Sequence, residues 1–180
     1  YADLIVDTSK GLTSMIDSFL VYSKLANGKA TVKERPFRMM DIAEQLKMEY
    51  EPFAAKKQLE LSVNNKADGV VNGDKEKVLT IGRNLLSNAI KYTDHGTIRI
   101  SAVSYEMFAR IDISDTGSGI SESEQAKIFA RFYRSNSVQK QEGVGIGLYL
   151  ARQIISGEGG YIKVASVPGK GSTFSIFLPK

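Results

Sequence analysis

The 180-residue chain has no cysteine and one histidine, His95. The absence of cysteine excludes a disulfide framework and a thiolate metal site, and one histidine cannot build a histidine metal cluster. No apolar run approaches the ~18 residues of a membrane span, and the N-terminus lacks the basic end and apolar block of a secretory signal. We therefore expect a soluble chain with neither kind of metal centre, and the cysteine content leaves its redox compartment open.

Charge and length limit the partners and the number of domains that the chain can have. Lys and Arg number 24 against 20 Asp and Glu, a net charge of +4 from scattered residues, which argues against nucleic acid as the main partner. The length fits one ordinary domain, alone or with a small appendage. Because the chain begins in a helix-like pattern without a start methionine, we expect a fragment whose parent continues upstream.

Hydrophobic periodicity divides the chain into elements. Over 1–26, apolar residues recur seven apart, which predicts one helix that needs a partner helix. Residues 116–142 have no clear period, and a loop of that length is usually functional or disordered. The remaining patterns predict strands at 30–37, 59–63, 70–71, 96–105, 108–115, 161–167 and 172–179, and helices at 41–55, 74–92 and 145–155.

The order of these elements predicts an α+β fold. Strands joined as hairpins and mixed with helices indicate a two-layer sandwich of a mixed, mainly antiparallel sheet against about three helices, preceded by one long helix. We place the boundary between two units at 28/29, with the long helix in 1–28 and the sandwich in 29–180.

The stretch NLLSNAIKYT, residues 84–93, carries the first candidate site. Wound as a helix, it places Asn84, Asn88 and Lys91 on one face and apolar residues on the other. Taken alone, that polar stripe is typical of the solvent face of any amphipathic helix.

Two glycine-containing stretches follow. DTGSGI, 115–120, places an aspartate at a strand end before two glycines, which fits a carboxylate held toward a ligand and equally fits a plain turn. EGVGIGLYLAR, 142–152, opens a helix with glycines, and bare amides at a helix start suit phosphate. Its spacing fits neither the Walker A loop nor the dinucleotide fingerprint.

Taken together and in this order, these stretches resemble the ATP-binding domain of sensor histidine kinases. NLLSNAIKYT resembles that family's N box, DTGSGI its first glycine box, FARFYR its phenylalanine box, GVGIGL its second glycine box and GKGSTF its last one. The resemblance covers about residues 30–180 and implies the Bergerat-type ATP-binding fold. The first helix resembles the second helix of the family's dimerisation hairpin.

The resemblance implies a role for each matching residue. Asn88 would hold Mg2+ through its amide oxygen, Asn84 and Lys91 would contact phosphates, and Asp115 would accept a hydrogen bond from the adenine amino group. The other implied nucleotide-binding residues are Gly117, Gly119, Ile120, Gly143, Gly145, Gly147, Leu148 and Thr173. The glycines of the second box would also hinge 121–142 as a lid over the triphosphate.

Some roles stay open at this point. Arg131 or Arg134 reaches the terminal phosphate, or both lie on a solvated lid. Tyr92 either packs near the nucleotide or closes the helix end. Phe129 and Phe132 are expected to fix the lid to the core rather than to contact ligand.

The function implied is that of a protein-histidine kinase whose phosphoacceptor helix is absent from this chain. It would bind Mg-ATP and pass the γ-phosphate to a histidine on the dimerisation hairpin, for relay to an aspartate of a response regulator. His95, in a turn, is not expected to accept phosphate. We expect a cytoplasmic domain of a homodimeric parent, membrane-bound as many of the family are.

Two alternatives remain. The same fold serves ATPases and serine kinases, although those ATPases place a carboxylate where Asn84 stands; or the domain is a docking module without kinase activity. Two departures from the family pattern, Gly82 in the asparagine helix and Glu158 where histidine is common, are expected to affect stability.

Overall fold

The structure is a computed structural model that describes residues 20, 35–65, 69–133 and 145–180. The helix expected over 1–26 and the boundary at 28/29 lie outside these residues, apart from Leu20, which is helical. The described elements are β1 (Arg35–Arg38), α2 (Met39–Lys56), β2 (Glu60–Asn65), β3 (Val70–Gly73), α3 (Lys75–Tyr92), β4 (Thr97–Ser104), β5 (Phe108–Asp115), α4 (Glu122–Gln125), α5 (Gly147–Gly157), β6 (Tyr161–Val167) and β7 (Gly171–Pro179).

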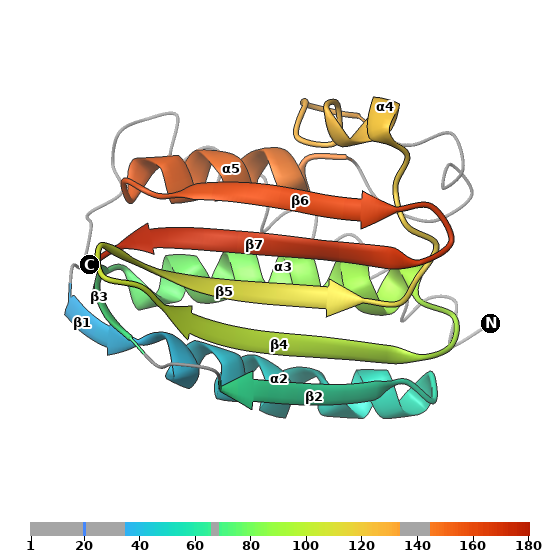
Figure 1. The fold of residues 1–180 in the computed structure, drawn as a ribbon, viewed down its shortest axis with the longest axis horizontal. Coiled ribbons are helices and arrows are strands. Elements are labelled where there is room, and N and C mark those ends of the chain that lie inside the picture. The colour runs from blue at the N-terminus through green and yellow to red at the C-terminus, as the bar shows by residue number, and fades with distance from the viewer. Residues whose placement is uncertain (1–19, 21–34, 66–68, 134–144) are drawn as a thin grey trace.

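One five-stranded sheet forms the body of the fold, with strand order β2-β4-β5-β7-β6. β2 pairs parallel to β4, and the other neighbours pair antiparallel. Figure 1 shows α2, α3 and α5 on one side of this sheet, so the predicted two-layer α+β sandwich is confirmed. The sequence did not indicate that β1 and β3 would pair as a separate two-stranded sheet.

The central strands of the sheet bury residues of one face against the helices. On β5 the buried side chains are Ala109, Ile111 and Ile113, and on β7 they include Phe174 and Ile176. Because side chains alternate between the faces of a strand, the polar residues between them lie on the face away from the helices.

α3 occupies the middle of the helical layer, in contact with both α2 and α5. Its Gly82, expected to weaken the helix, lies where α2 crosses closely: a Cβ there would stand 2.5 Å from Leu46 Cδ1. Leu46 is fully buried, so the glycine makes room for a core side chain. The close approach is therefore the reason for a residue that helices otherwise disfavour.

The start of α3 is tied to the end of α5. Asp74 is the N-cap that the sequence predicted, and its carboxylate accepts the amides of Glu76 at 3.1 Å and Lys77 at 3.4 Å. Glu158 accepts the Asp74 amide at 3.1 Å and pairs with Lys77 Nζ at 2.8 Å. With a side chain only 4% exposed, Glu158 joins the two helices through a shielded ion pair.

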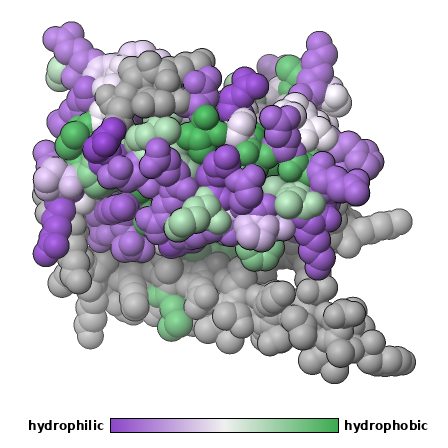
Figure 2. Space-filling model, turned by 90° about the horizontal axis from the view of Figure 1, so that it is seen from below, coloured by the Kyte–Doolittle hydropathy of each residue, from purple (hydrophilic) through white to green (hydrophobic). Residues whose placement is uncertain are grey.

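The lower face of the molecule, over α2 and β2, is mainly hydrophilic (Figure 2). Hydrophobic groups appear there as separate spots, and Met48 and Phe53 of α2 are 73% and 57% exposed. Among the described helices, none is long and apolar enough to span a bilayer.

Candidate functional site

The stretches singled out from the sequence meet at α3. The last turn of α3 lies against the loop that follows β5, and the first turn of α5 lies against Asn84, in the middle of α3. In Figure 1 α2 and α3 run toward the right, where β5 also ends, whereas α5 begins nearer the centre and runs back toward the left. The helix carrying the asparagines, the aspartate and the glycine-opened helix are thus brought together by the topology.

Asp115 lies at the end of β5 with its carboxylate held by two amides. Its Oδ1 accepts the amide of Gly117 at 2.9 Å and that of Ser172, on the neighbouring β7, at 3.3 Å. Burial raises the pKa of the Asp115 carboxyl, and these two amide hydrogen bonds partly oppose the rise. The result is a half-buried acceptor on a rigid strand.

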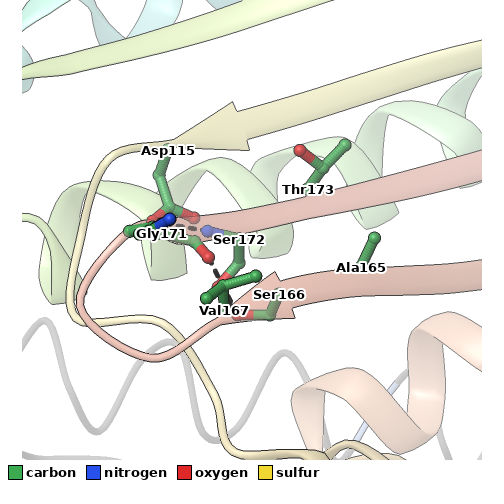
Figure 3. Close-up of a pocket in the computed structure, with 8 residues that line it drawn as sticks. Asp115, Ala165, Ser166, Val167, Gly171, Ser172 and Thr173 are labelled. Atoms are coloured by element: carbon green, nitrogen blue, oxygen red, sulfur yellow. Dashed lines mark hydrogen bonds between the residues drawn. The ribbon is translucent and has the colours of Figure 1, made fainter.

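A pocket of about 230 Å3 opens beside Asp115 (Figure 3). Ser166 is one of the residues that line it. The Ser166 hydroxyl accepts the Ile120 amide at 2.8 Å and lies 2.9 Å from the Ser172 hydroxyl. The residues lining the pocket are Asp115, Ala165, Ser166, Val167, Lys170, Gly171, Ser172 and Thr173.

Thr173 and Ser172 take different faces of the sheet. Ser172 pairs with Asp115 in the register and shares its face, toward the helices. The Thr173 hydroxyl instead lies 2.9 Å from the hydroxyl of Ser114, on the opposite face. Thr173 reaches the pocket lining at the strand end, but the structure favours Ser172 as the polar group beside the aspartate.

The two glycines after Asp115 let the backbone pass close to its neighbours. A Cβ on Gly117 would collide with the Tyr92 carbonyl oxygen and stand 2.9 Å from both Asp115 Oδ1 and Thr93 Oγ1. Gly119 has φ +70°, and a Cβ there would collide with the Val167 carbonyl. Both positions therefore require glycine for close packing, and Gly119 also for its backbone conformation.

Asn84 and Gly147 connect α3 to α5. A Cβ on Gly147 would stand 2.5 Å from Asn84 Oδ1, so the absence of a side chain lets the amide reach the first turn of α5. Gly145, with φ +73°, makes the turn into that helix. The N box and the second glycine box thus form one surface. Ile120 and Leu148 are partly buried against the core beside it.

The other polar residues of α3 lie along the same side. Asn88 is half-buried, and Lys91 Nζ lies 5.3 Å from the centroid of the Tyr92 ring. The described residues contain no group of three Asp, Glu or His side chains suited to a metal ion. The side chain of Asn88 offers an amide oxygen, a type of ligand that suits Mg2+.

Two buried polar atoms support the fit of a polar ligand. Asn84 Nδ2 and Thr93 Oγ1 are shielded from solvent and have no hydrogen-bond partner among the described residues. Asn84 faces the start of α5, and Thr93 lies beneath Gly117 and close to Asp115. Because buried polar groups are nearly always paired, both sides of the site lack partners that a nucleotide or its waters would supply.

The segment after β5 contains the short helix α4, which the sequence did not indicate. Ile128 is buried, and the Phe129 ring meets Phe174 edge-on at 6.4 Å, so Phe129 packs against the core as predicted. The same prediction for Phe132 is wrong: it is 66% exposed. Arg131 lies 5.1 Å from the centroid of the Tyr149 ring on α5. Arg134 and Gly143 lie outside the described residues.

Three residues beside Asp115 were missed from the sequence: Ser166, Ser172 and Thr93. For Ser172 a signal existed, since the apolar alternation of Phe174 and Ile176 places it on the core face. Thr93 is the last residue of the stretch NLLSNAIKYT, but no function was predicted for it. The position of Ser166 beside the site results from the pairing of its strand with β7, and no local sequence pattern indicates it.

Comparison with known proteins identifies the family of the chain. Residues 73–180 match the family described as histidine kinase-, DNA gyrase B-, and HSP90-like ATPase. The chain is 35% identical to the circadian input-output histidine kinase CikA of Synechococcus elongatus, over all of this chain and 25% of that protein. It spans about a fifth to a quarter of the length of the curated relatives it matches.

Solved structures share the fold. Full-length ShkA in complex with AMPPNP superposes with a TM-score of 0.86 at 22% identity, over 99% of this chain and 38% of that one. ThkA in complex with the response regulator protein TrrA gives 0.80 at 22% identity, over 100% and 50%. The chain belongs to the histidine kinase-, DNA gyrase B-, and HSP90-like ATPase family, and the relatives it resembles are sensor histidine kinases.

Proposed function

We propose that the chain binds Mg-ATP at the end of α3 and acts as the catalytic part of a sensor histidine kinase. Asp115 would accept the adenine amino group, because a carboxylate held by two amides keeps its other acceptor positions free. Asn88 would hold Mg2+, and Asn84 and Lys91 would contact the phosphates. Mg2+ would neutralise charge on the phosphates, which is most of what phosphoryl transfer asks of a site.

The proposed acceptor is a histidine on a dimerisation hairpin of the parent protein, with residues 1–28 as the second helix of that hairpin. The proposed second partner is a response regulator. ThkA, of the same fold, has been solved with such a regulator, and ShkA with an ATP analogue. We place the domain in the cytoplasm of a homodimeric, membrane-bound parent.

The observation that carries the proposal is the close approach of Asn84 and Gly147, because it joins the N box to the second glycine box beside Asn84 Nδ2, a buried donor with no partner among the described residues. Asn84 carries an amide where related ATPases carry a catalytic carboxylate. We therefore favour transfer to a protein over steady hydrolysis, and steady ATP hydrolysis by the chain would argue for the ATPase alternative.

Calorimetric titration tests the metal role. The wild-type chain is expected to bind ATP at least ten times more tightly with Mg2+ than without it, a difference of about 1.4 kcal/mol. Asn88→Ala should lose that difference, whereas Asn72→Ala, at an exposed asparagine of β3, should keep it. Retention of the magnesium effect in Asn88→Ala would remove the assigned role.

Incubation with γ-labelled ATP tests the missing acceptor. The chain is expected to bind the nucleotide without labelling itself, because His95 is an exposed turn residue after α3. Acid-labile phosphate on His95 would contradict this. The absence of any ATP binding would instead favour the docking-module alternative.

A further inference from the structure

Lys57 makes an unusual set of contacts with the last turn of α3. It is the C-cap residue of α2, and its Nζ donates to the backbone carbonyls of Ile90 at 2.9 Å, Lys91 at 3.1 Å and Thr93 at 2.8 Å. An ammonium has three N–H donors, so each has an acceptor. The acceptors are carbonyls that a helix end leaves without intrahelical partners.

Charge strengthens these contacts. The carbonyls at a helix C-terminus carry partial negative charge, which a cation stabilises. Asp94 Oδ1 also lies 3.5 Å from Lys57 Nζ, but its side chain is 87% exposed, so it adds little. The three carbonyls, rather than the ion pair, define where the ammonium lies.

One carbonyl of this turn has a different partner. The Tyr92 carbonyl accepts the amide of Ser118 at 3.2 Å, and Ser118 lies in the loop that follows Asp115. Gly117, next to it, allows the loop to pass against the same carbonyl. The end of α3 is therefore held from one side by a lysine of α2 and from the other by the loop of the first glycine box.

We infer that Lys57 is a positioning residue for the nucleotide site. By fixing the carbonyls on either side of Tyr92, it aims the Tyr92 carbonyl at the Ser118 amide and so sets the loop that supports Asp115. The same turn carries Lys91 and Tyr92, so their placement depends on it as well. This inference rests on the proposed function, since it assigns Lys57 to the same Mg-ATP site.

The test compares three variants of the chain. Lys57→Met keeps the aliphatic stem and removes the donors. Lys57→Arg keeps the charge, but a planar guanidinium cannot direct N–H groups to three carbonyls that converge on one atom. Lys56→Met is the matched control: it makes the same charge change as Lys57→Met, at an exposed neighbour for which the described contacts include no bond to α3.

Two measurements are made at a temperature where each variant is folded: Mg-ATP affinity by calorimetry, and hydrogen exchange of the Ser118 amide by NMR. Lys57→Met should weaken affinity about 10-fold and speed exchange about 10-fold, the size expected for losing a well-placed charged hydrogen-bond set. Lys57→Arg should lose about 3-fold in each, and Lys56→Met should stay within 2-fold of the wild type.

A purely structural role for Lys57 would lower the melting temperature and leave both readouts unchanged in the folded variant. Equal affinity and exchange in Lys57→Met and Lys56→Met would therefore overturn the inference. Should Lys57→Met fail to fold, Lys57→Arg decides by the same comparison. A wild-type chain that does not bind Mg-ATP would refute the proposed function instead, and the Ser118 exchange would still test the link from Lys57.

Discussion

α3 and the segment that follows β5 both contribute to the site, but the fold holds them differently. α3 buries a row of side chains and is tied at its start by Glu158 and at its end by Lys57. Within residues 116–133, all of them described, Ile128 is the one buried residue. The groups proposed to select the base and hold the metal therefore lie on well-packed elements, whereas Arg131, expected near the terminal phosphate, lies in a segment that buries little.

The largest effect is expected from removing the rigid acceptor. Asp115→Ala should weaken ATP affinity about 30- to 100-fold, since it deletes the proposed adenine contact and leaves the Gly117 and Ser172 amides unpaired. Asp112→Ala is the control, because Asp112 lies on the other face of the same strand and bonds Ser175. Calorimetric titration measures the ATP affinity of both variants. Similar losses of affinity in the two would mean that Asp115 does not bind the adenine base.

The second-largest effect is expected from a substitution where α3 meets α5. Gly147→Ala is expected to weaken Mg-ATP binding about 10-fold, because its Cβ would press on the Asn84 amide. Gly157→Ala lies on the same helix, and its Cβ would meet nothing within 4 Å, so it should keep affinity and gain up to about 1 kcal/mol of stability. Unchanged binding of Mg-ATP in Gly147→Ala would mean that Asn84 does not contribute to the nucleotide site.

An ion pair between α2 and α3 supports the rigid region. Arg83 donates to Glu49 at 2.7 and 2.9 Å, and these hydrogen bonds lower the Glu49 pKa from 4.5 to about 2. Because the folded-state pKa is lowered, its contribution is complete above about pH 4.5 and is lost as the pH falls toward 2. Both side chains are about 30% exposed, so we expect only about 1 kcal/mol.

Acid unfolding measures this contribution. Chemical denaturation between pH 6 and pH 3 should show a smaller acid-induced loss of stability in Glu49→Gln than in the wild type. The same pH dependence in both proteins would mean that the pair contributes nothing.

The smallest effect is expected on the lightly packed segment. Phe132 is 66% exposed, so Phe132→Ala should change the free energy of unfolding by less than about 0.5 kcal/mol. Phe129→Ala removes the contact with Phe174 and should cost more, about 1 to 2 kcal/mol. Thermal unfolding compares the two, and a loss in Phe132→Ala as large as that in Phe129→Ala would contradict the light packing at Phe132.

The sequence was sufficient to locate several strands and the helix α3, but not to give the order of the strands in the sheet. Alternation over 108–115 predicted one strand, the glycine turn before 172–179 predicted a closing hairpin strand, and Asp74 predicted the start of α3, because these signals depend on neighbouring residues alone. The four-residue α4 is too short to show a helical period. The contacts of Lys57 with α3 depend on tertiary packing across 33 to 36 residues, which no spacing rule predicts.

For the site, too, local motifs could be predicted and tertiary contacts could not. The order of the boxes predicted that Asn84, Asp115 and Gly147 belong together. The structure places Gly147 against Asn84, and it places the glycine loop after Asp115 against the end of the same helix. Thr173 was predicted from the motif alone, and Ser172, which also lines the pocket, was not named because the motif does not show which face of the strand a residue takes. Phe132 was assigned to the core by its aromatic type, although its neighbours carry no apolar period.

Calorimetric titration with ATP and with GTP, in the presence of Mg2+, tests the central claim most directly. If Asp115 accepts the amino group of adenine, ATP should bind at least ten times more tightly than GTP, because guanine presents a carbonyl oxygen at that position and two acceptors would then face each other. Equal affinity for the two nucleotides, or no heat with ATP, would contradict the account.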